Sequence, residues 1–122
     1  MFVDDVESIR KSAKVCLARA GYSVTTASSA REALEIFLAN PDHFKLVVTD
    51  QAMANMTGEE LSIELLRLSP DIPIIICTGH SEVISPESTR EIGIRAYLQK
   101  PVTPTELRRV VREVLDEAVP GH

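Results

Sequence analysis

A net charge of −5 over 122 residues argues against nucleic acid or an anionic membrane surface as the main partner of this chain. The length fits a single domain over residues 1–122, with 118–122 as a tail or the start of a linker, and the 44% hydrophobic content is that of a globular protein. No apolar run approaches the roughly 18 residues of a membrane span, and the start MFVDD does not resemble a signal peptide, so we expect a cytoplasmic protein.

Five short apolar runs are candidates for β-strands. They are FV at 2–3, SVTTA at 23–27, KLVVTD at 45–50, IPIIICT at 72–78 and IRAYLQK at 94–100. The third and fourth runs are almost continuously apolar and rich in Val and Ile, as strands covered on both faces are. The first run has only about three residues before Asp4, which is short for a central strand and suggests either a truncated chain or an unusually short first strand.

Helical segments with readable ends lie between these runs. They are expected at about 6–20, ending at Gly21; from Ser29 to near Asn40-Pro41; from Thr57 to before Pro70; from Ser85-Pro86 to Gly93; and from Thr103-Pro104 onwards. Glu32 and Glu60 follow two of the predicted caps at the spacing of a capping box. Alternating strands and helices predict a parallel sheet with right-handed crossovers.

The two cysteines, Cys16 and Cys77, lie far apart in the sequence and have no metal-ligand spacing. Cys16 lies on an apolar helical face and Cys77 in an apolar strand. We therefore expect both to be small core residues rather than redox or metal groups.

Polar side chains stand where four of the predicted strands end. These are Asp4-Asp5, Asp50, Thr78 and Lys100, the last followed by Pro101. Because ligands bind beyond the carboxyl ends of parallel strands, we expect these groups to converge on one edge of the sheet. Taken singly, each group has a structural explanation: an Asp before the first helix can cap it, and Asp50 can begin a turn.

Taken together, the groups indicate a chemical site. Three neighbouring carboxylates repel one another unless a cation intervenes, and Mg²⁺ prefers oxygen ligands. A carboxylate beside Mg²⁺ and a lysine is suited to attack phosphorus, because the two cations neutralise the charge on the phosphoryl oxygens. A threonine hydroxyl at the same edge can bind one of those oxygens.

Four segments carry a resemblance to a known family: FVDD at 2–5, VVTDQAM at 47–53, IIICTG at 74–79 and YLQKP at 97–101. In this order and spacing they resemble response-regulator receiver domains over essentially the whole chain. The resemblance implies an α/β fold, the flavodoxin-like (βα)5 three-layer sandwich of CheY-like proteins, with a parallel five-stranded sheet of order 2-1-3-4-5. It also implies that the chain takes a phosphoryl group from the phosphohistidine of a sensor histidine kinase or phosphotransfer protein, without turning over a separate substrate.

The same resemblance implies roles at the phosphorylation site. Asp50 is the phosphoacceptor. Asp5 and Asp50 bind Mg²⁺ or Mn²⁺ directly, Asp4 assists through water, and the main-chain carbonyl of Ala52 supplies another ligand. Lys100 contacts the phosphoryl group and precedes a cis peptide bond to Pro101.

Thr78 and Tyr97 match the switching pair of the family, in which the hydroxyl moves to the phosphoryl oxygen and the ring turns inward. Tyr97 alone is equally well explained as a half-buried aromatic on an edge strand. The chain has Ala54 where the family often has proline, which should loosen that loop. Ala52 and His80 hold the places that flank the hydrolytic water. Our hypothesis is that Ala52 cannot orient this water and that His80 screens or orients it, against the simpler view of His80 as an exposed loop residue.

Other functions are less consistent with the residues. A haloacid-dehalogenase-type hydrolase needs a second acid two residues after the nucleophile, where this chain has Ala52. A flavin or nucleotide binder needs a phosphate loop after the first strand, where this chain has DDVES. A degenerate receiver that serves as a protein-interaction scaffold is the main alternative, disfavoured because all the chemical groups are present.

Partner surfaces are expected by analogy with the family. Helix 4, strand 5 and helix 5 would dock an effector or form a homodimer. Arg108, Arg109 and Arg112 could serve that face, although solvated charge explains them equally well. The segments QAMANMTGEEL and CTGHSE most resemble those of receiver domains attached to hybrid sensor kinases.

Overall fold

The computed structural model describes residues 1–79 and 92–118 as nine helices and strands. The strands are β1 (Phe2–Val3), β2 (Thr26–Ala27), β3 (Val47–Asp50), β4 (Ile74–Thr78) and β5 (Ala96–Gln99). The helices are α1 (Glu7–Arg19), α2 (Ala30–Ala39), α3 (Gly58–Leu68) and α5 (Pro104–Ala118). The helix predicted from Ser85 lies almost wholly outside the described residues. No helix in the described ranges is long and apolar enough to cross a membrane.

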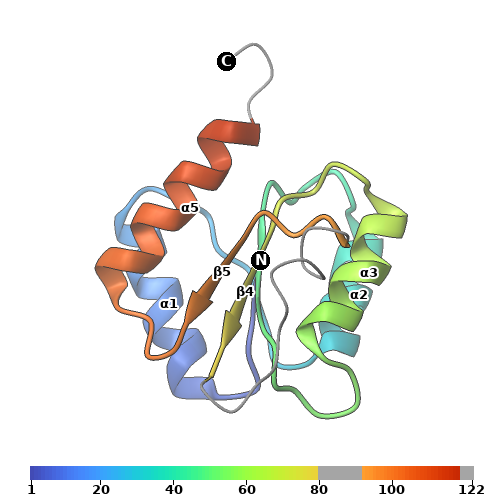
Figure 1. Cartoon of the computed structure of the whole chain (residues 1–122), viewed down its shortest axis with the longest axis horizontal. Helices are drawn as coiled ribbons and strands as arrows, with labels where there is room; N and C mark the ends of the chain where they lie inside the picture. Colours follow the sequence, from blue (N-terminus) through green and yellow to red (C-terminus); the bar gives the residue numbers. More distant parts are fainter. Residues whose placement is uncertain (80–91, 119–122) are drawn as a thin grey trace.

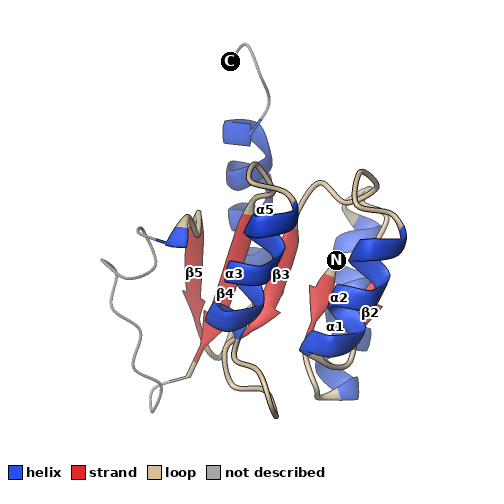
Figure 2. Cartoon of the chain, turned by 90° about the vertical axis from the view of Figure 1, so that its right-hand side faces the viewer, coloured by secondary structure: helices blue, strands red, loops and turns tan. Residues whose placement is uncertain are grey.

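The strands form one parallel sheet of order β2-β1-β3-β4-β5, which confirms the predicted order. Figure 1 shows the sheet nearly edge-on, with α1 and α5 on one side and α2 and α3 on the other. In Figure 2 the same sheet is seen behind α2 and α3, with the arrowheads of β3, β4 and β5 pointing the same way. The carboxyl ends of the strands therefore share one edge.

Alternate residues of the central strands pack on opposite faces of the sheet. Ile75 and Cys77 of β4 lie in the apolar cluster under α1 and α5, whereas Ile74 and Ile76 lie in the cluster under α2 and α3. This is why β3 and β4 are apolar at nearly every position. Cys77 and Cys16 are free and buried, as predicted.

Side-chain caps fix where most of the helices begin. Thr57 and Glu60 form the predicted capping box, with two hydrogen bonds of 3.1 Å. At the start of α2 the box is only half formed. The Ser29 hydroxyl accepts from the Glu32 N–H at 3.1 Å, but the Glu32 carboxylate accepts from the N–H of Ser28, one residue earlier than a capping box requires.

Two other predicted helix ends also appear in the structure. The Thr103 hydroxyl accepts from the N–H of Glu106 at 3.1 Å, so α5 begins as expected. Gly21, after α1, has a φ of 98°, and Gly93 has a φ of 104°. Both values lie in the left-handed region that glycine adopts without a steric penalty.

Candidate functional site

Three carboxylates meet at the carboxyl edge of the sheet. Asp4, Asp5 and Asp50 each present an oxygen atom, and these atoms all lie within 4.8 Å of one another. Asp4 is 2% exposed and Asp50 is 4% exposed, whereas Asp5 is open to solvent. The chain thus gathers three acidic ligands from two strand ends, and the cluster has the composition of a site that can bind a hard cation.

Lys100 approaches the same edge from the end of β5. Its Nζ lies 2.7 Å from Oδ1 of Asp50, and its main-chain N–H donates to the main-chain oxygen of Thr78 at 2.7 Å. Thr78 itself is buried at the end of β4. The predicted convergence of acids, hydroxyl and ammonium is therefore present at one edge.

The carboxylate of Asp50 is buried with unused acceptor capacity. Its Oδ1 is paired with the ammonium of Lys100 at 2.7 Å and has no further hydrogen-bond donor in the described part of the chain. Buried carboxylate oxygens are normally satisfied by donors or by a metal ion. A buried carboxylate that is paired with one lysine and lies within 4.8 Å of two further acids fits Mg²⁺ coordination.

Asp4 holds the turn that leads into α1. Its Oδ1 accepts from the N–H of Val6 at 2.9 Å, and its main-chain oxygen accepts from Nη1 of Arg10 at 2.7 Å. Val6 is the N-cap residue of α1 and makes no side-chain cap. The structural explanation of Asp4 or Asp5 as the helix cap is therefore wrong, because Asp4 bonds to an N–H that precedes the helix.

The environment of Asp4 disfavours its charged form. Burial raises the pKa of the Asp4 carboxyl, the hydrogen bond from Val6 opposes that rise, and the negative charge of Asp50 adds to it. The raised pKa and the cluster geometry agree. Without a bound cation, the buried negative charges at this edge of the sheet are only partly compensated by Lys100 and by solvent.

The main chain at Asp50 is fixed by its neighbours. The Thr49 hydroxyl donates to the Asp50 main-chain oxygen at 3.0 Å, and the Gln51 N–H donates to the main-chain oxygen of Cys77 at 2.9 Å. A Cβ at Gly58 would lie only 2.6 Å from the Asp50 oxygen, so α3 begins directly against this carbonyl. Sequence reasoning missed Gly58. The signal was a glycine immediately after a capping residue, where helix propensity gives no reason for it.

The other predicted residues occupy different surroundings. The Ala52 side chain is exposed, and Tyr97 on β5 is 47% exposed. The peptide bond between Lys100 and Pro101 is cis. His80, proposed to influence phosphoryl lifetime, lies outside the described residues.

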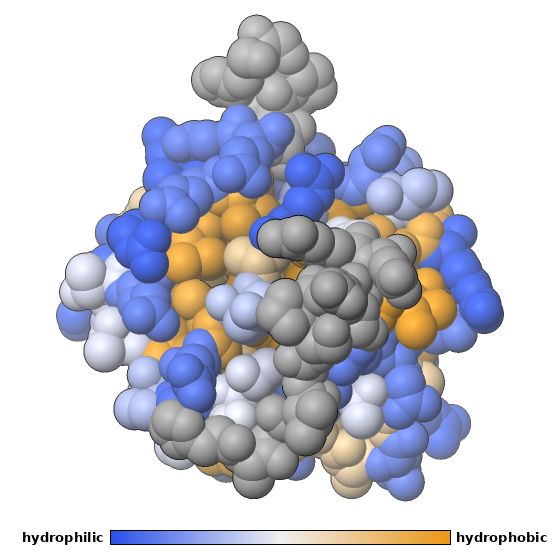
Figure 3. Space-filling view, viewed as in Figure 1, coloured by the Kyte–Doolittle hydropathy of each residue, from blue (hydrophilic) through white to orange (hydrophobic). Residues whose placement is uncertain are grey.

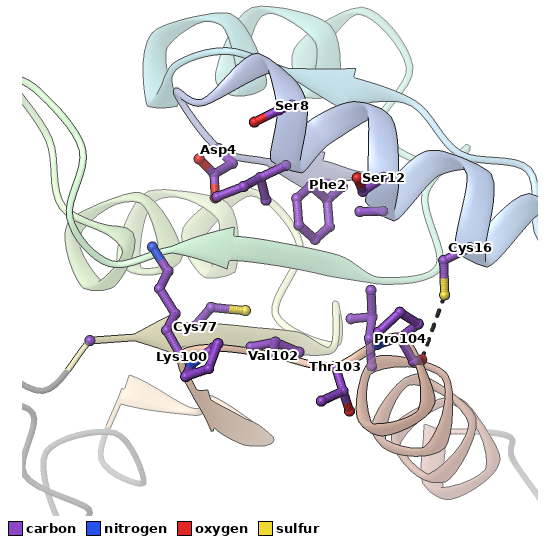
Figure 4. A pocket seen from close by; sticks show the side chains of 15 residues that line it. Phe2, Asp4, Ser8, Ser12, Cys16, Cys77, Lys100, Val102, Thr103 and Pro104 are labelled. Atoms are coloured by element: carbon purple, nitrogen blue, oxygen red, sulfur yellow. Dashed lines mark hydrogen bonds between the residues drawn. The ribbon is translucent and has the colours of Figure 1, made fainter.

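A cavity of about 570 Å³ adjoins the site, between α1 and the segment that joins β5 to α5. Figure 4 shows Asp4 and Lys100 at one end of this cavity, with Nζ of Lys100 pointing toward the Asp4 side. At the other end, Sγ of Cys16 donates to the main-chain oxygen of Pro104 at 3.6 Å. The walls between are largely apolar.

Comparison with known proteins agrees with this geometry. Residues 1–112 match the family described as the response regulator receiver domain. The chain belongs to this family. The family predicted from the four sequence segments is thereby confirmed, and the chain is a receiver domain of two-component signal transduction.

The receiver domain is similar to parts of longer regulators. It is 31% identical to the transcriptional regulatory protein GlrR of Escherichia coli, over 99% of this chain and 27% of GlrR. It is 40% identical to the probable transcriptional regulator ycf27 of Porphyra purpurea, over 97% of this chain and 47% of that protein. The receiver domain thus spans between about a quarter and about half of these relatives.

Solved structures share both its fold and its length. A response regulator receiver domain protein from Clostridium thermocellum is 31% identical with a TM-score of 0.89, covering 95% of this chain and 92% of that one. A CheY-like receiver domain protein from Methanospirillum hungatei is 33% identical with a TM-score of 0.86, covering 96% and 92%.

Proposed function

We propose that Asp50 accepts a phosphoryl group from the phosphohistidine of a sensor histidine kinase or phosphotransfer protein. A carboxylate oxygen of Asp50 forms the new bond to phosphorus as the bond from phosphorus to the imidazole nitrogen breaks, and the imidazole keeps the electron pair and takes up a proton. The observation that carries the proposal is the buried Asp50 carboxylate, 2.7 Å from Lys100 and within 4.8 Å of two further acids. The chain itself is the acceptor, so no separate substrate is turned over.

The acids would hold Mg²⁺, or Mn²⁺ in its place. Asp5 and Asp50 would be direct ligands, Asp4 would assist through water, and the main-chain carbonyl of Ala52 would supply the remaining protein ligand. When bound, the ion neutralises charge on the phosphoryl oxygens. Lys100 supplies the remaining positive charge from the β5 side, and its ion pair holds the Asp50 carboxylate in place before transfer.

Thr78 and Tyr97 would report phosphorylation. In the sheet register Thr78 pairs with Gln99 and Tyr97 with Ile76, so the two side chains lie on the same face of adjacent strands. Thr78 is buried beside the site, and Tyr97 is turned toward solvent. We assign this orientation to the unphosphorylated state. An unchanged Tyr97 environment after phosphorylation, measured by NMR, would contradict the assignment.

The β5–α5 surface would carry the output. Figure 3 shows apolar surface between β5 and α5, bordered by hydrophilic residues of α5. A groove there is lined by residues that include Leu98, Val110 and Glu106. Arg109 and Arg112 are exposed and paired within α5, to Glu113 and Asp116. We therefore assign partner contacts to the apolar strip, and a phosphorylation-dependent change in sedimentation would test for a homodimer.

Ala52 would set the phosphoryl lifetime, because its methyl group cannot hydrogen-bond to a hydrolytic water. The variant Ala52→Asn supplies an amide at that place. An unchanged rate of dephosphorylation in this variant would refute the assignment.

One experiment separates the phosphoacceptor from a scaffold. The chain is incubated with a small-molecule phosphodonor and Mg²⁺, and its intact mass is measured. Wild type should gain the mass of one phosphoryl group, and Asp50→Asn should gain none. Asp42→Asn is the matched control, because Asp42 is exposed and precedes β3 at the opposite end of the sheet. If wild type gains no phosphoryl group from any donor and binds no Mg²⁺, the scaffold function takes its place.

A further inference from the structure

Gln51 and Glu59 exchange two hydrogen bonds across the loop that joins β3 to α3. The Glu59 N–H donates to Oε1 of Gln51 at 2.9 Å, and Nε2 of Gln51 donates to Oε1 of Glu59 at 3.1 Å. The Gly58 N–H adds a third bond, to the main-chain oxygen of Gln51 at 3.1 Å. The loop over 52–57 is thus closed at its base by three hydrogen bonds between residue 51 and the first turn of α3.

This brace, the side-chain pair Gln51–Glu59, is connected to the sheet and to Asp50. Gln51 is anchored to β4 through its N–H, which donates to Cys77 at 2.9 Å. On the other side, the start of α3 leaves no room against the Asp50 carbonyl, since a Cβ at Gly58 would lie 2.6 Å from it. A displacement of the first turn of α3 would therefore be transmitted to the main chain at Asp50 and to the residue that follows Gln51.

The chemistry of the pair goes beyond helix capping. The Glu59 N–H is one of the first four N–H groups of α3, which have no partner within the helix, and any acceptor at Gln51 would satisfy it. The second bond, from Nε2 of Gln51 to the Glu59 carboxylate, is not needed for capping. Among side chains of this length only an amide both accepts from an N–H and donates to a carboxylate. Both side chains are partly buried, so water competes less for these bonds.

We propose that Gln51 is a positioning residue for the metal and phosphoryl site. Its bonds to Glu59 hold residues 50–52 so that the Asp50 carboxylate and the Ala52 carbonyl keep the arrangement that binds Mg²⁺. The inference rests on the proposed function, in which these two groups are metal ligands. Gln51 contacts neither the ion nor the phosphoryl group, and it acts through the main chain that it fixes.

Mg²⁺ binding measured by titration calorimetry tests the brace without requiring phosphorylation. Gln51→Met keeps the length of the side chain and removes both bonds, and Glu59→Met removes the carboxylate while keeping the backbone N–H. We expect each to weaken Mg²⁺ binding by about tenfold, the usual effect of losing a partner that orients a metal ligand. Glu59→Gln retains the acceptor oxygen and should stay within about twofold of wild type.

Glu64→Met is the matched control. Glu64 lies on the same helix, and within residues 1–79 and 92–118 its side chain bonds only to Arg67, at 3.1 Å, so its loss should leave Mg²⁺ affinity unchanged. Wild-type Mg²⁺ affinity in Gln51→Met would overturn the proposal, even if its melting temperature were lower, because the brace would then be structural alone. If Gln51→Met does not fold, the same comparison is made between Glu59→Met and Glu59→Gln, and equal affinities there overturn it. Absence of Mg²⁺ binding by wild type is a separate result, which overturns the proposed metal site and the brace with it.

Discussion

The contact between Gly58 and Asp50 gives the sharpest test of how α3 supports the site. In Gly58→Ala the new Cβ would lie 2.6 Å from the main-chain oxygen of Asp50 and 3.1 Å from its carbonyl carbon. These atoms belong to the backbone, so they cannot move aside as a flexible side chain can. The helix or the end of β3 must shift instead.

The expected magnitude follows from two opposing terms. Overpacking of a tight contact costs about 1–3 kcal/mol of unfolding free energy. Alanine is better than glycine within a helix by at most about 1 kcal/mol, which offsets part of that cost. The net loss lies between about 0 and 3 kcal/mol, and we expect Gly58→Ala to lose about 1–2 kcal/mol, near the middle of that range. We also expect slower phosphorylation of Asp50, because the displaced carbonyl belongs to the proposed phosphoacceptor.

Urea unfolding followed by circular dichroism measures the first effect, and intact-mass kinetics with a small phosphodonor measures the second. Gly21→Ala is the control. Gly21 has a φ of 98°, and a Cβ added there would meet nothing within 4 Å beyond its chain neighbours, so alanine strains only the backbone. That strain costs about 1–2 kcal/mol, far from the site. Gly21→Ala should thus be destabilised yet phosphorylated at the wild-type rate. A Gly58→Ala variant that matches wild type in both stability and rate would refute the close-contact argument.

Two further substitutions test the charges of the site. Asp4→Asn keeps an oxygen for the Val6 N–H and removes one buried negative charge. Without metal it should raise the unfolding free energy at neutral pH, because the Asp4 charge is buried and is repelled by Asp50, with Lys100 partly offsetting that repulsion. Repulsion between charges within 4.8 Å of each other contributes about 1–4 kcal/mol. The folded-state pKa of Asp4 is raised above 3.8. The destabilisation caused by its charge is therefore absent below that pH and grows as the pH rises through the folded pKa. Urea unfolding at several pH values should show the stability gain of Asp4→Asn vanish in acid, and a gain independent of pH would contradict this account. Lys100→Met removes the cation 2.7 Å from Asp50. It should slow phosphorylation by about 100-fold, as loss of a transition-state charge contact does, while Mg²⁺ binding persists. An unchanged initial rate of phosphorylation, measured by intact mass, would show that Lys100 does not contribute to the reaction.

Much of the site could be predicted because its residues stand where the predicted strands end. Four of the five apolar runs stop at a polar group, and a parallel sheet brings those stops to one edge. That logic placed Asp50, Thr78 and Lys100 together although they are far apart in sequence. The capping box at Thr57 was equally predictable, since it depends on a fixed local spacing.

The sequence could not reveal side-chain contacts between residues that have no regular spacing along the chain. The brace between Gln51 and Glu59 joins two polar residues across an irregular loop, and no spacing rule pairs them. The half-formed box at Ser29 and the turn bond of Asp4 depend on one-residue shifts in the main chain. Such shifts are set by how a loop meets its helix, which tertiary packing decides.

Charge balance at the sheet edge explains why metal and phosphoryl group should bind cooperatively. Three carboxylates and Lys100 leave a formal charge of about −2, which one divalent ion neutralises. Phosphorylation replaces the single charge of Asp50 by about −1.5 to −2, so the edge becomes more negative and its attraction for the ion increases. Linkage requires the reciprocal effect: bound Mg²⁺ must favour phosphorylation of Asp50 to the same degree that phosphorylation favours Mg²⁺ binding.

Removal of Mg²⁺ should accordingly lower the extent of phosphorylation at a fixed concentration of phosphodonor. The phosphorylated protein should in turn bind Mg²⁺ more tightly than the unmodified protein. Asp4→Asn reduces the negative charge by one, so its phosphorylation should depend less steeply on Mg²⁺ concentration than that of wild type. Titration of Mg²⁺ with intact mass as the readout measures both curves. Identical curves would show that Asp4 does not take part in the charge balance and that, of the three acids, Asp5 and Asp50 are sufficient to hold the ion.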